Sequence, residues 1–184
     1  MDTLTTGDIA KYCDVNLRTV IRWIDKGHIK SFKLPGRGNN RVLITDFLSF
    51  LNEHKMPIPK EFREYLKRVL IIDDDELMSR SINRVIKGAG FETLVVNNSF
   101  HAGEAIISFL PSIITLDLQM PGIDGWKILE HIKSNPDFNR LKIIVISAMP
   151  ENQLRLAEEK GADVVLSKPF DNRELVRILN NFSS

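Results

Sequence analysis

Five short aliphatic runs alternate with segments of helical periodicity from Val69 to Phe182, and this alternation restricts the fold more than any other feature. The runs predict strands at residues 69–72, 91–96, 112–117, 142–147 and 164–167. The intervening periodicity predicts helices at residues 77–90, 99–110, 125–135, 151–162 and 171–182. Five successive strand–helix units indicate a parallel sheet, because parallel neighbours need a crossover connection. Since the runs are aliphatic without alternation, helices should cover both faces of that sheet.

The first aliphatic run, VLII (69–72), is followed directly by four acidic residues, DDDE (73–76). Ligands of open parallel sheets bind beyond the carboxyl ends of the strands. Four of the predicted strands place polar residues there: Asp73, Asp74, Asp117, Ser147 and Lys168. Neighbouring carboxylates oppose one another's ionisation, and a hard divalent cation relieves this conflict. Mg²⁺ binds one or two carboxylates together with water and phosphate, so the sequence predicts a Mg²⁺ site at this edge.

Four motifs occur in order at these strand ends: DD (73–74), D-x-x-MPG-x-DG (117–125), SA (147–148) and KPF (168–170). Together they resemble the receiver domain of two-component response regulators, over about residues 67–184. The resemblance implies an α/β, flavodoxin-like (βα)5 fold with strand order 2-1-3-4-5. The rival interpretation, an acid-lined structural edge, does not need Lys168 and Ser147 as well.

The resemblance also implies a role for each residue of this edge. Asp117 accepts a phosphoryl group from a phosphohistidine of a sensor histidine kinase. Mg²⁺ is held by Asp74, Asp117 and the backbone carbonyl of Gln119, with Asp73 acting through a water. Lys168 pairs with one phosphoryl oxygen and Ser147 donates a hydrogen bond to another. The Lys168–Pro169 bond is expected to be cis. The protein assists only its own phosphorylation and dephosphorylation, so we do not expect an enzyme.

One residue departs from the pattern of this family. Receivers usually carry an aromatic residue three positions before the lysine, and its rotamer follows the hydroxyl on the fourth strand. This chain has Val165 there, which has no ring to move. The resemblance therefore does not extend to the usual coupling between the phosphorylation site and the far face of the fifth strand.

Charge is distributed unevenly along the chain: the first 60 residues, called the head below, are net basic, and the rest of the chain is net acidic. Residues 1–60 contain ten Lys and Arg against six Asp and Glu, and residues 61–184 contain fifteen against eighteen. Pro57 and Pro59 interrupt the chain between them, which favours an extended link. We therefore predict one domain at 1–55, a partly helical linker at 56–66 and a receiver at 67–184. A single domain with a surface loop is the alternative.

The head is predicted to be a small DNA-binding domain. Thr5 or Thr6 caps a first helix, and a second helix faces it with Leu17, Val20 and Ile24 before Gly27 closes it. Residues 29–33 and 41–44 form a hairpin with a basic tip, and Thr45 caps a last helix. Two helices and a basic wing indicate a winged helix-turn-helix.

The strings LTTGDIA and RTVIRWIDKG, with the Gly, Asn and Arg of the wing, resemble the excisionase-type branch of the MerR-like DNA-binding fold. This resemblance implies double-stranded DNA as partner. The expected contacts are Arg18, Thr19, Arg22 and Lys26 on the second helix, and Lys33, Arg37, Asn39 and Arg41 on the wing. Trp23 is expected to serve in core or hinge packing rather than in stacking on a base. The alternative is a basic helical module that binds protein.

Composition excludes some other classes. The chain has 43% hydrophobic residues, no membrane-length apolar run and no signal-peptide pattern, so we expect a cytoplasmic protein without a membrane partner. Its single cysteine, Cys13, is expected to be a packed thiol. The sequence predicts a phosphorylation-controlled DNA-binding transcriptional response regulator, with a homodimer left open. The alternative is a receiver that works without phosphate in dimerisation or protein docking.

Overall fold

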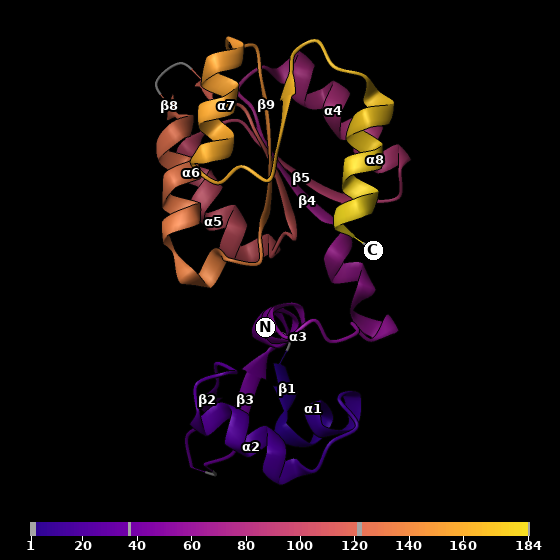
Figure 1. Ribbon diagram of the computed structural model, residues 1–184, viewed down its shortest axis with the longest axis vertical. Coiled ribbons are helices and arrows are strands. Elements are labelled where there is room, and N and C mark those ends of the chain that lie inside the picture. Colours follow the sequence, from indigo (N-terminus) through magenta and orange to yellow (C-terminus); the bar gives the residue numbers. More distant parts are fainter. Residues whose placement is uncertain (1–2, 37, 121–122, 184) are drawn as a thin grey trace. The chain divides into compact units, whose positions relative to one another are not determined.

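The computed structural model describes residues 3–36, 38–120 and 123–183, and only the backbone of Ser99, Phe100 and Ile123. The chain divides into two compact units, Met1–Glu61 and Phe62–Ser184, and each is described by itself. Figure 1 labels their elements. Among the described residues, no helix has both the length and the apolar character needed to cross a membrane.

The smaller unit combines three helices with a three-stranded antiparallel sheet in the order β1-β3-β2. Its elements are β1 (Thr3–Thr5), α1 (Thr6–Tyr12), α2 (Leu17–Asp25), β2 (Phe32–Lys33), β3 (Asn40–Leu43) and α3 (Ile44–Glu53). β2 and β3 form the predicted wing. β1 is an addition to the prediction, because its three residues become a strand only by pairing with β3, where Leu4 lies opposite Val42.

The ends of the first two helices follow from local chemistry. Thr5 caps α1 in a capping box, since its Oγ1 accepts from Asp8 N at 3.0 Å and its own N donates to Asp8 Oδ2 at 2.9 Å. Gly27, with φ of +74°, follows the end of α2 as predicted. The prediction that Thr45 caps α3 is wrong. The helix begins at Ile44 directly after β3, with Leu43 at the cap position and no side-chain cap.

Aromatic and aliphatic side chains of all three helices fill the core of the smaller unit. Trp23 packs on Phe50 with ring centroids 4.9 Å apart, which agrees with its predicted core role. Cys13 is half-buried, and burial raises the pKa of its thiol. Val20 is fully buried, but Leu17 is 46% exposed, so the prediction that Leu17 packs against the first helix is wrong. Leu17 is the first residue of α2.

The larger unit is a five-stranded parallel sheet with helices on both faces. Its first elements are η1, a 3₁₀ helix (Lys60–Lys67), β4 (Arg68–Ile72), α4 (Glu76–Gly88), β5 (Glu92–Val96), α5 (Ser99–Phe109) and β6 (Ile113–Leu116). The remaining ones are β7 (Gln119–Met120), β8 (Ile123–Asp124), α6 (Gly125–Ser134), η2 (Pro136–Phe138), β9 (Lys142–Ser147), α7 (Glu151–Glu159), β10 (Val164–Ser167) and α8 (Asn172–Phe182). The sheet order is β5-β4-β6-β9-β10. If these five strands are numbered 1 to 5 as they occur along the chain, their order across the sheet is 2-1-3-4-5, which is the predicted flavodoxin-like order.

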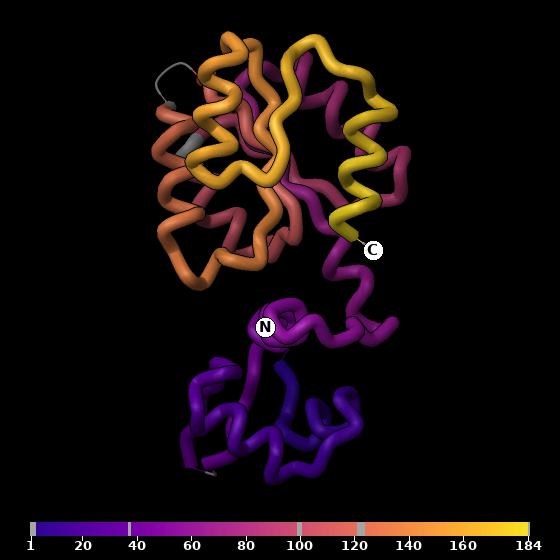
Figure 2. The backbone as a smooth tube through the Cα atoms, in the orientation of Figure 1, coloured from indigo at the N-terminus to yellow at the C-terminus, as the bar shows by residue number. Residues whose placement is uncertain are grey.

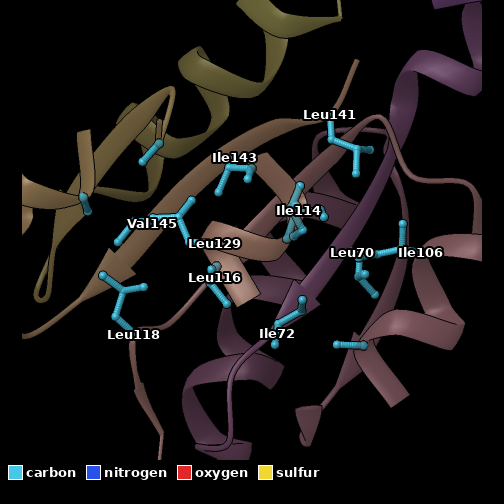
Figure 3. Packing of buried hydrophobic residues seen from close by; sticks show 14 of the residues in the cluster. Leu70, Ile72, Ile106, Ile114, Leu116, Leu118, Leu129, Leu141, Ile143 and Val145 are labelled. Carbon is cyan, nitrogen blue, oxygen red and sulfur yellow. The ribbon is translucent and has the colours of Figure 1, made fainter. Parts of the chain in front are cut away.

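Each strand sends alternate residues into two separate cores, as expected for a sheet covered on both faces. Leu70, Ile114 and Ile143 belong to the core that α5, α6 and α7 cover, as Figure 3 shows. Their strand neighbours point to the other face, where α4 and α8 close the second core. All five strands are therefore anchored on both faces, which fixes the position of their carboxyl ends.

The helical stretch before β4 packs on the larger unit. Phe62 is buried at 4% exposure, and the carbonyl of Leu66 accepts a hydrogen bond from Ser112 Oγ at 2.7 Å. The guanidinium of Arg68 lies 5.0 Å above the ring of Tyr65. Figure 2 traces this path from α3 through η1 into β4. The apolar side of η1 is therefore used in packing at the amino end of β4.

Thr115 on β6 offers a test of the core. The side chain is buried at 2% exposure, and within the described part of the chain its Oγ1 has no hydrogen-bond partner. Because a buried unpaired hydroxyl is costly, Thr115→Val should raise the free energy of unfolding by about 1–2 kcal/mol. Urea denaturation of the larger unit measures the difference. Thr115→Ser, which keeps the hydroxyl and loses a methyl group, should be less stable than wild type, and a Thr115→Val protein no more stable than wild type would contradict this interpretation.

Candidate functional site

Polar side chains from four strands meet at the carboxyl edge of the sheet in the larger unit. Asp73 and Asp74 follow β4, Asp117 follows β6, Ser147 is the last residue of β9 and Lys168 follows β10. Hydrogen bonds connect Asp73, Asp117, Ser147 and Lys168 directly. Asp74 joins this group through the proximity of its carboxylate to those of Asp73 and Asp117. The structure thus brings together the five residues that the strand ends predicted.

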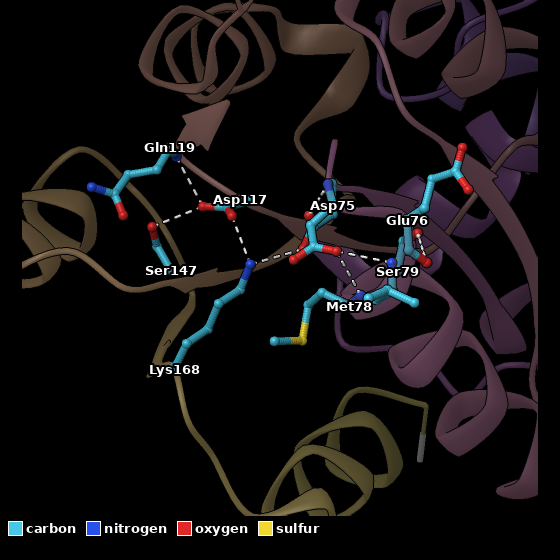
Figure 4. Close-up of polar contacts among 10 residues, drawn as sticks. Asp75, Glu76, Met78, Ser79, Asp117, Gln119, Ser147 and Lys168 are labelled. Carbon is cyan, nitrogen blue, oxygen red and sulfur yellow. Dashed lines mark hydrogen bonds and ion pairs between the residues drawn. The ribbon is translucent and has the colours of Figure 1, made fainter. Parts of the chain in front are cut away.

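Both oxygens of the Asp117 carboxylate are held in place. Lys168 Nζ donates to Oδ2 at 2.6 Å, while Ser147 Oγ and the backbone N of Gln119 donate to Oδ1 at 2.8 and 2.9 Å. Lys168 Nζ also donates to Asp73 Oδ2 at 2.9 Å. Figure 4 shows the side chain of Lys168 extending toward Asp117 at this edge of the sheet. With Asp117 only 6% exposed, its carboxylate is fixed in orientation at the surface of the core.

The acidic residues have the geometry of a cation site. One oxygen from each of Asp73, Asp74 and Asp117 lies within 4.8 Å of the other two. Asp73 and Asp117 are buried while Asp74 is half-buried, so water can reach the group only on the side of Asp74. Three carboxylate oxygens are the donors that a hard divalent cation prefers, and the partly open side leaves room for water. The residues therefore fit the Mg²⁺ ion that the sequence predicted.

Burial and charge oppose one another inside this group. Burial raises the pKa of Asp73, and the hydrogen bond and charge of Lys168 offset only part of that effect. Burial alone would lower the pKa of Lys168, but its hydrogen bonds and ion pairs with Asp117 and Asp73 outweigh it and raise the pKa. Lys168 is therefore charged at neutral pH, and it supplies the positive charge that the acidic residues need.

Gly125, the last residue of the D-x-x-MPG-x-DG motif, is a positioning residue. A Cβ at Gly125 would lie 2.6 Å from the carbonyl oxygen of Asp117 and 2.6 Å from the Cα of Leu118. The first turn of α6 therefore rests on the backbone that carries Asp117. Asp124 caps this helix, because its Oδ1 accepts from Lys127 N at 3.3 Å. Pro121 and Gly122 of the same motif lie outside the described residues.

The predicted DNA contacts occupy α2 and the wing of the smaller unit. Arg18, Arg22 and Lys26 are exposed on α2, and Thr19 is half-buried. On the hairpin, Lys33 and Asn39 are exposed and Arg41 is half-buried, while Arg37 lies outside the described residues. Two successive elements thus present cationic side chains to solvent, and their contact with DNA stays a prediction.

Comparison with known proteins agrees with both units. Residues 69–180 match the response regulator receiver domain family, and residues 3–55 match a helix-turn-helix domain family. The chain therefore belongs to the response regulator receiver family and carries an N-terminal helix-turn-helix domain.

Relatives and solved structures match the receiver. The DNA-binding response regulator MtrA of Mycobacterium tuberculosis is 30% identical over 60% of this chain and 47% of its own length. The phosphate regulon transcriptional regulatory protein PhoB of Pseudomonas aeruginosa is 32% identical over 60% of this chain and 48% of its own length. The chain thus spans about half of these relatives. A response regulator signal receiver domain from Bermanella marisrubri has 37% identity and a TM-score of 0.61, covering 64% of this chain and 98% of that one.

Because the backbone of Asp117 and Leu118 lies so close to Gly125, any side chain at this position should destabilise the larger unit. Gly125→Ala should lower the free energy of unfolding of the larger unit by about 2 kcal/mol or more, because backbone atoms must shift to admit the methyl group. It should also move the NMR amide signal of Gln119, which donates to Asp117. Gly103→Ala is the matched control, since the added Cβ meets no described atom within 4 Å apart from its chain neighbours and the adjacent backbone of its own helix. This change in α5 should be neutral or stabilising, and equal effects of the two substitutions would refute the role of Gly125.

Proposed function

We propose that this protein is a phosphorylation-controlled DNA-binding transcriptional regulator that accepts a phosphoryl group on Asp117 from a sensor histidine kinase. The observation that carries the proposal is the convergence of Asp117, Lys168 and Ser147 with two further carboxylates at one sheet edge. Membership of the receiver family and the similarity to DNA-binding response regulators support it. The protein acts as a phosphoacceptor and not as an enzyme on other substrates.

The geometry suits transfer to a carboxylate. One oxygen of Asp117 attacks phosphorus, forming a P–O bond while the P–N bond of the phosphohistidine breaks and its nitrogen leaves with the electron pair. Lys168 Nζ lies 2.6 Å from Asp117 Oδ2. From this position it can pair with a negatively charged oxygen of the phosphoryl group once that group is attached to Asp117. Ser147 Oγ, 2.8 Å from Asp117 Oδ1, is placed to donate to another. The rate enhancement comes mainly from this positioning and electrostatic stabilisation.

The acidic residues serve a divalent cation in this scheme. Asp74, Asp117 and the backbone carbonyl of Gln119 would hold Mg²⁺, and Asp73 would reach it through water. When bound, the ion supplies charge neutralisation for the transferring group. Asp73 is also tied to the loop that follows it, because its Oδ1 accepts from Asp75 N at 2.9 Å. This hydrogen bond fixes the carboxylate before any ion arrives.

A receiver that works without phosphate, as a dimerisation or docking unit, is the second candidate. Val165 favours it, because this half-buried side chain packs on the core under α5, α6 and α7 and offers no ring to follow Ser147. The complete set of pocket residues favours phosphorylation. The two candidates differ in whether phosphorylation changes DNA affinity or assembly.

Phosphorylation of Asp117 is directly testable. With Mg²⁺ and a small-molecule phosphodonor such as acetyl phosphate, the intact mass should rise by one phosphoryl group that hydroxylamine removes. Asp117→Asn should abolish labelling, because the nucleophilic oxygen is lost. Lys168→Ala should give a protein that responds poorly to phosphorylation. Glu130→Gln, at an exposed carboxylate of α6, is the control and should label normally, whereas undiminished labelling of Asp117→Asn would disprove the assignment.

DNA binding by α2 and the wing predicts two kinds of substitution effect. Arg18→Ala and Arg22→Ala should each cost about 1–3 kcal/mol of binding free energy and relax specificity at one position. Arg41→Ala, or Arg37→Ala, should weaken all sequences alike and flatten the salt dependence, because phosphate contacts release counterions. Fluorescence anisotropy on selected and scrambled duplexes measures both effects. Arg155→Ala, at an exposed arginine of α7, is the control, and wild-type affinity of the Arg18→Ala/Arg22→Ala double variant would exclude this docking mode.

A further inference from the structure

Helix α2 exposes two apolar side chains beside its arginines. Leu17 is 46% exposed and Ile21 is 39% exposed. They are one helical turn apart, and so are Arg18 and Arg22, which directly follow them in the sequence. At about 100° per residue, Leu17 and Ile21 form one stripe along the helix and the two arginines form a parallel stripe next to it. The helix therefore presents apolar and cationic groups side by side.

The core of the smaller unit does not need this apolar stripe. Val20 is fully buried on the packed face of α2, and Trp23 and Ile24 are half-buried beside it. Trp23 reaches the core through its contact with Phe50. Leu17 and Ile21 thus lie between the packed face and the arginines, where a residue chosen only for solubility would be polar.

The major groove of DNA offers a partner for both stripes at once. Its edge carries the acceptors N7 and O6 of guanine, which arginine binds, and the C5-methyl group of thymine, which apolar side chains contact. Residues in the first turns of a recognition helix lie nearest the bases, and Leu17 to Arg22 occupy these turns of α2. The Asn16 side chain fixes this end of the helix by accepting from Arg18 N at 2.9 Å.

We propose that Leu17 and Ile21 recognise thymine methyl groups and set the sequence preference of α2, while Arg18 and Arg22 bind the neighbouring guanines or phosphates. The inference rests on the proposed DNA binding and adds the chemical class of bases that the helix selects. Each lost methyl contact should weaken binding roughly fourfold, the value expected for one buried methylene-sized group.

The charges around the stripe favour DNA over a protein partner. Arg18, Arg22 and Lys26 are exposed on α2, and Asp25 is the exposed acid of the same helix, one turn beyond Ile21. A protein surface that covered Leu17 and Ile21 would desolvate these cations, and each would need its own acidic partner. DNA provides methyl groups and negative charge together. Asp25 suits the same groove, because a carboxylate accepts from cytosine N4.

The experiment removes single methyl groups from the DNA. Duplexes that the full-length protein selects from a random pool are resynthesised with dU in place of each dT in turn, which deletes the methyl group and keeps base pairing. At one or two positions, dU should weaken wild-type binding roughly fourfold. In Ile21→Ala or Leu17→Ala the effect of dU at the matching position should disappear, because the same contact cannot be lost twice.

Two further variants make the result specific. Ile21→Val, which keeps part of the apolar contact, should retain part of the dU sensitivity. Leu156→Ala removes an equally exposed leucine, 41% exposed on α7, and should change neither affinity nor dU sensitivity. Circular dichroism of each variant shows that the helices remain, which is expected because the substituted side chains lie outside the core.

The outcomes separate this inference from the proposed function. Full dU sensitivity in Ile21→Ala and in Leu17→Ala overturns the methyl contact and leaves DNA binding intact. If the variants instead change the sedimentation coefficient with unchanged dU sensitivity, the stripe is a contact between copies of the chain and the inference is overturned. If no sequence is enriched by the wild-type protein, the proposed DNA binding itself fails.

Discussion

The ion pairs of Lys168 are the interaction on which the rest of the site depends. Its Nζ lies 2.6 Å from Asp117 and 2.9 Å from Asp73, and its side chain is only 12% exposed. Lys168 Nζ therefore places one positive charge between two buried carboxylates, and its hydrogen bond and charge offset part of the effect by which burial raises the pKa of Asp73. Lys168 follows β10, whereas the carboxylates follow β4 and β6, and β9 separates β10 from β6. The pairing therefore exists only when β4, β6, β9 and β10 have all come together in this order.

Under the proposed function, phosphorylation would act directly on the same arrangement. A phosphoryl group on Asp117 adds negative charge at the point where Lys168 and Ser147 already donate, so both donors must change partners. Val165 lies two residues before the end of β10 and packs on the core, and its side chain has no polar group or ring to report this change. We therefore expect the response to pass through the positions of Lys168 and Ser147 rather than through a rotating aromatic side chain.

Much of this structure could be predicted from the sequence, because the informative signals are local. The aliphatic runs indicated the sheet, and strand ends in a parallel sheet share one edge, so Asp73, Asp117 and Lys168 could be placed together without coordinates. β1 could not be predicted, since its pairing partner lies almost forty residues away in the chain. The cap at Thr45 failed because β3 runs into α3 without a loop. The close approach of Gly125 depends on the path of α6, which no local pattern encodes.

The packing of η1 restricts how the signal can leave the receiver. Phe62 is buried and Ser112 binds the carbonyl of Leu66, so this stretch is attached at the amino end of β4. Asp117 lies at the opposite, carboxyl edge, and a strand of this length spans roughly 15 Å. A phosphoryl group can favour one arrangement of η1 only if the two ends of the sheet respond together. Both cores hold these strands tightly, which opposes such a movement. For the proposed regulation we therefore expect assembly between receivers, through a surface change near Asp117, to be the physically simpler route to altered DNA binding.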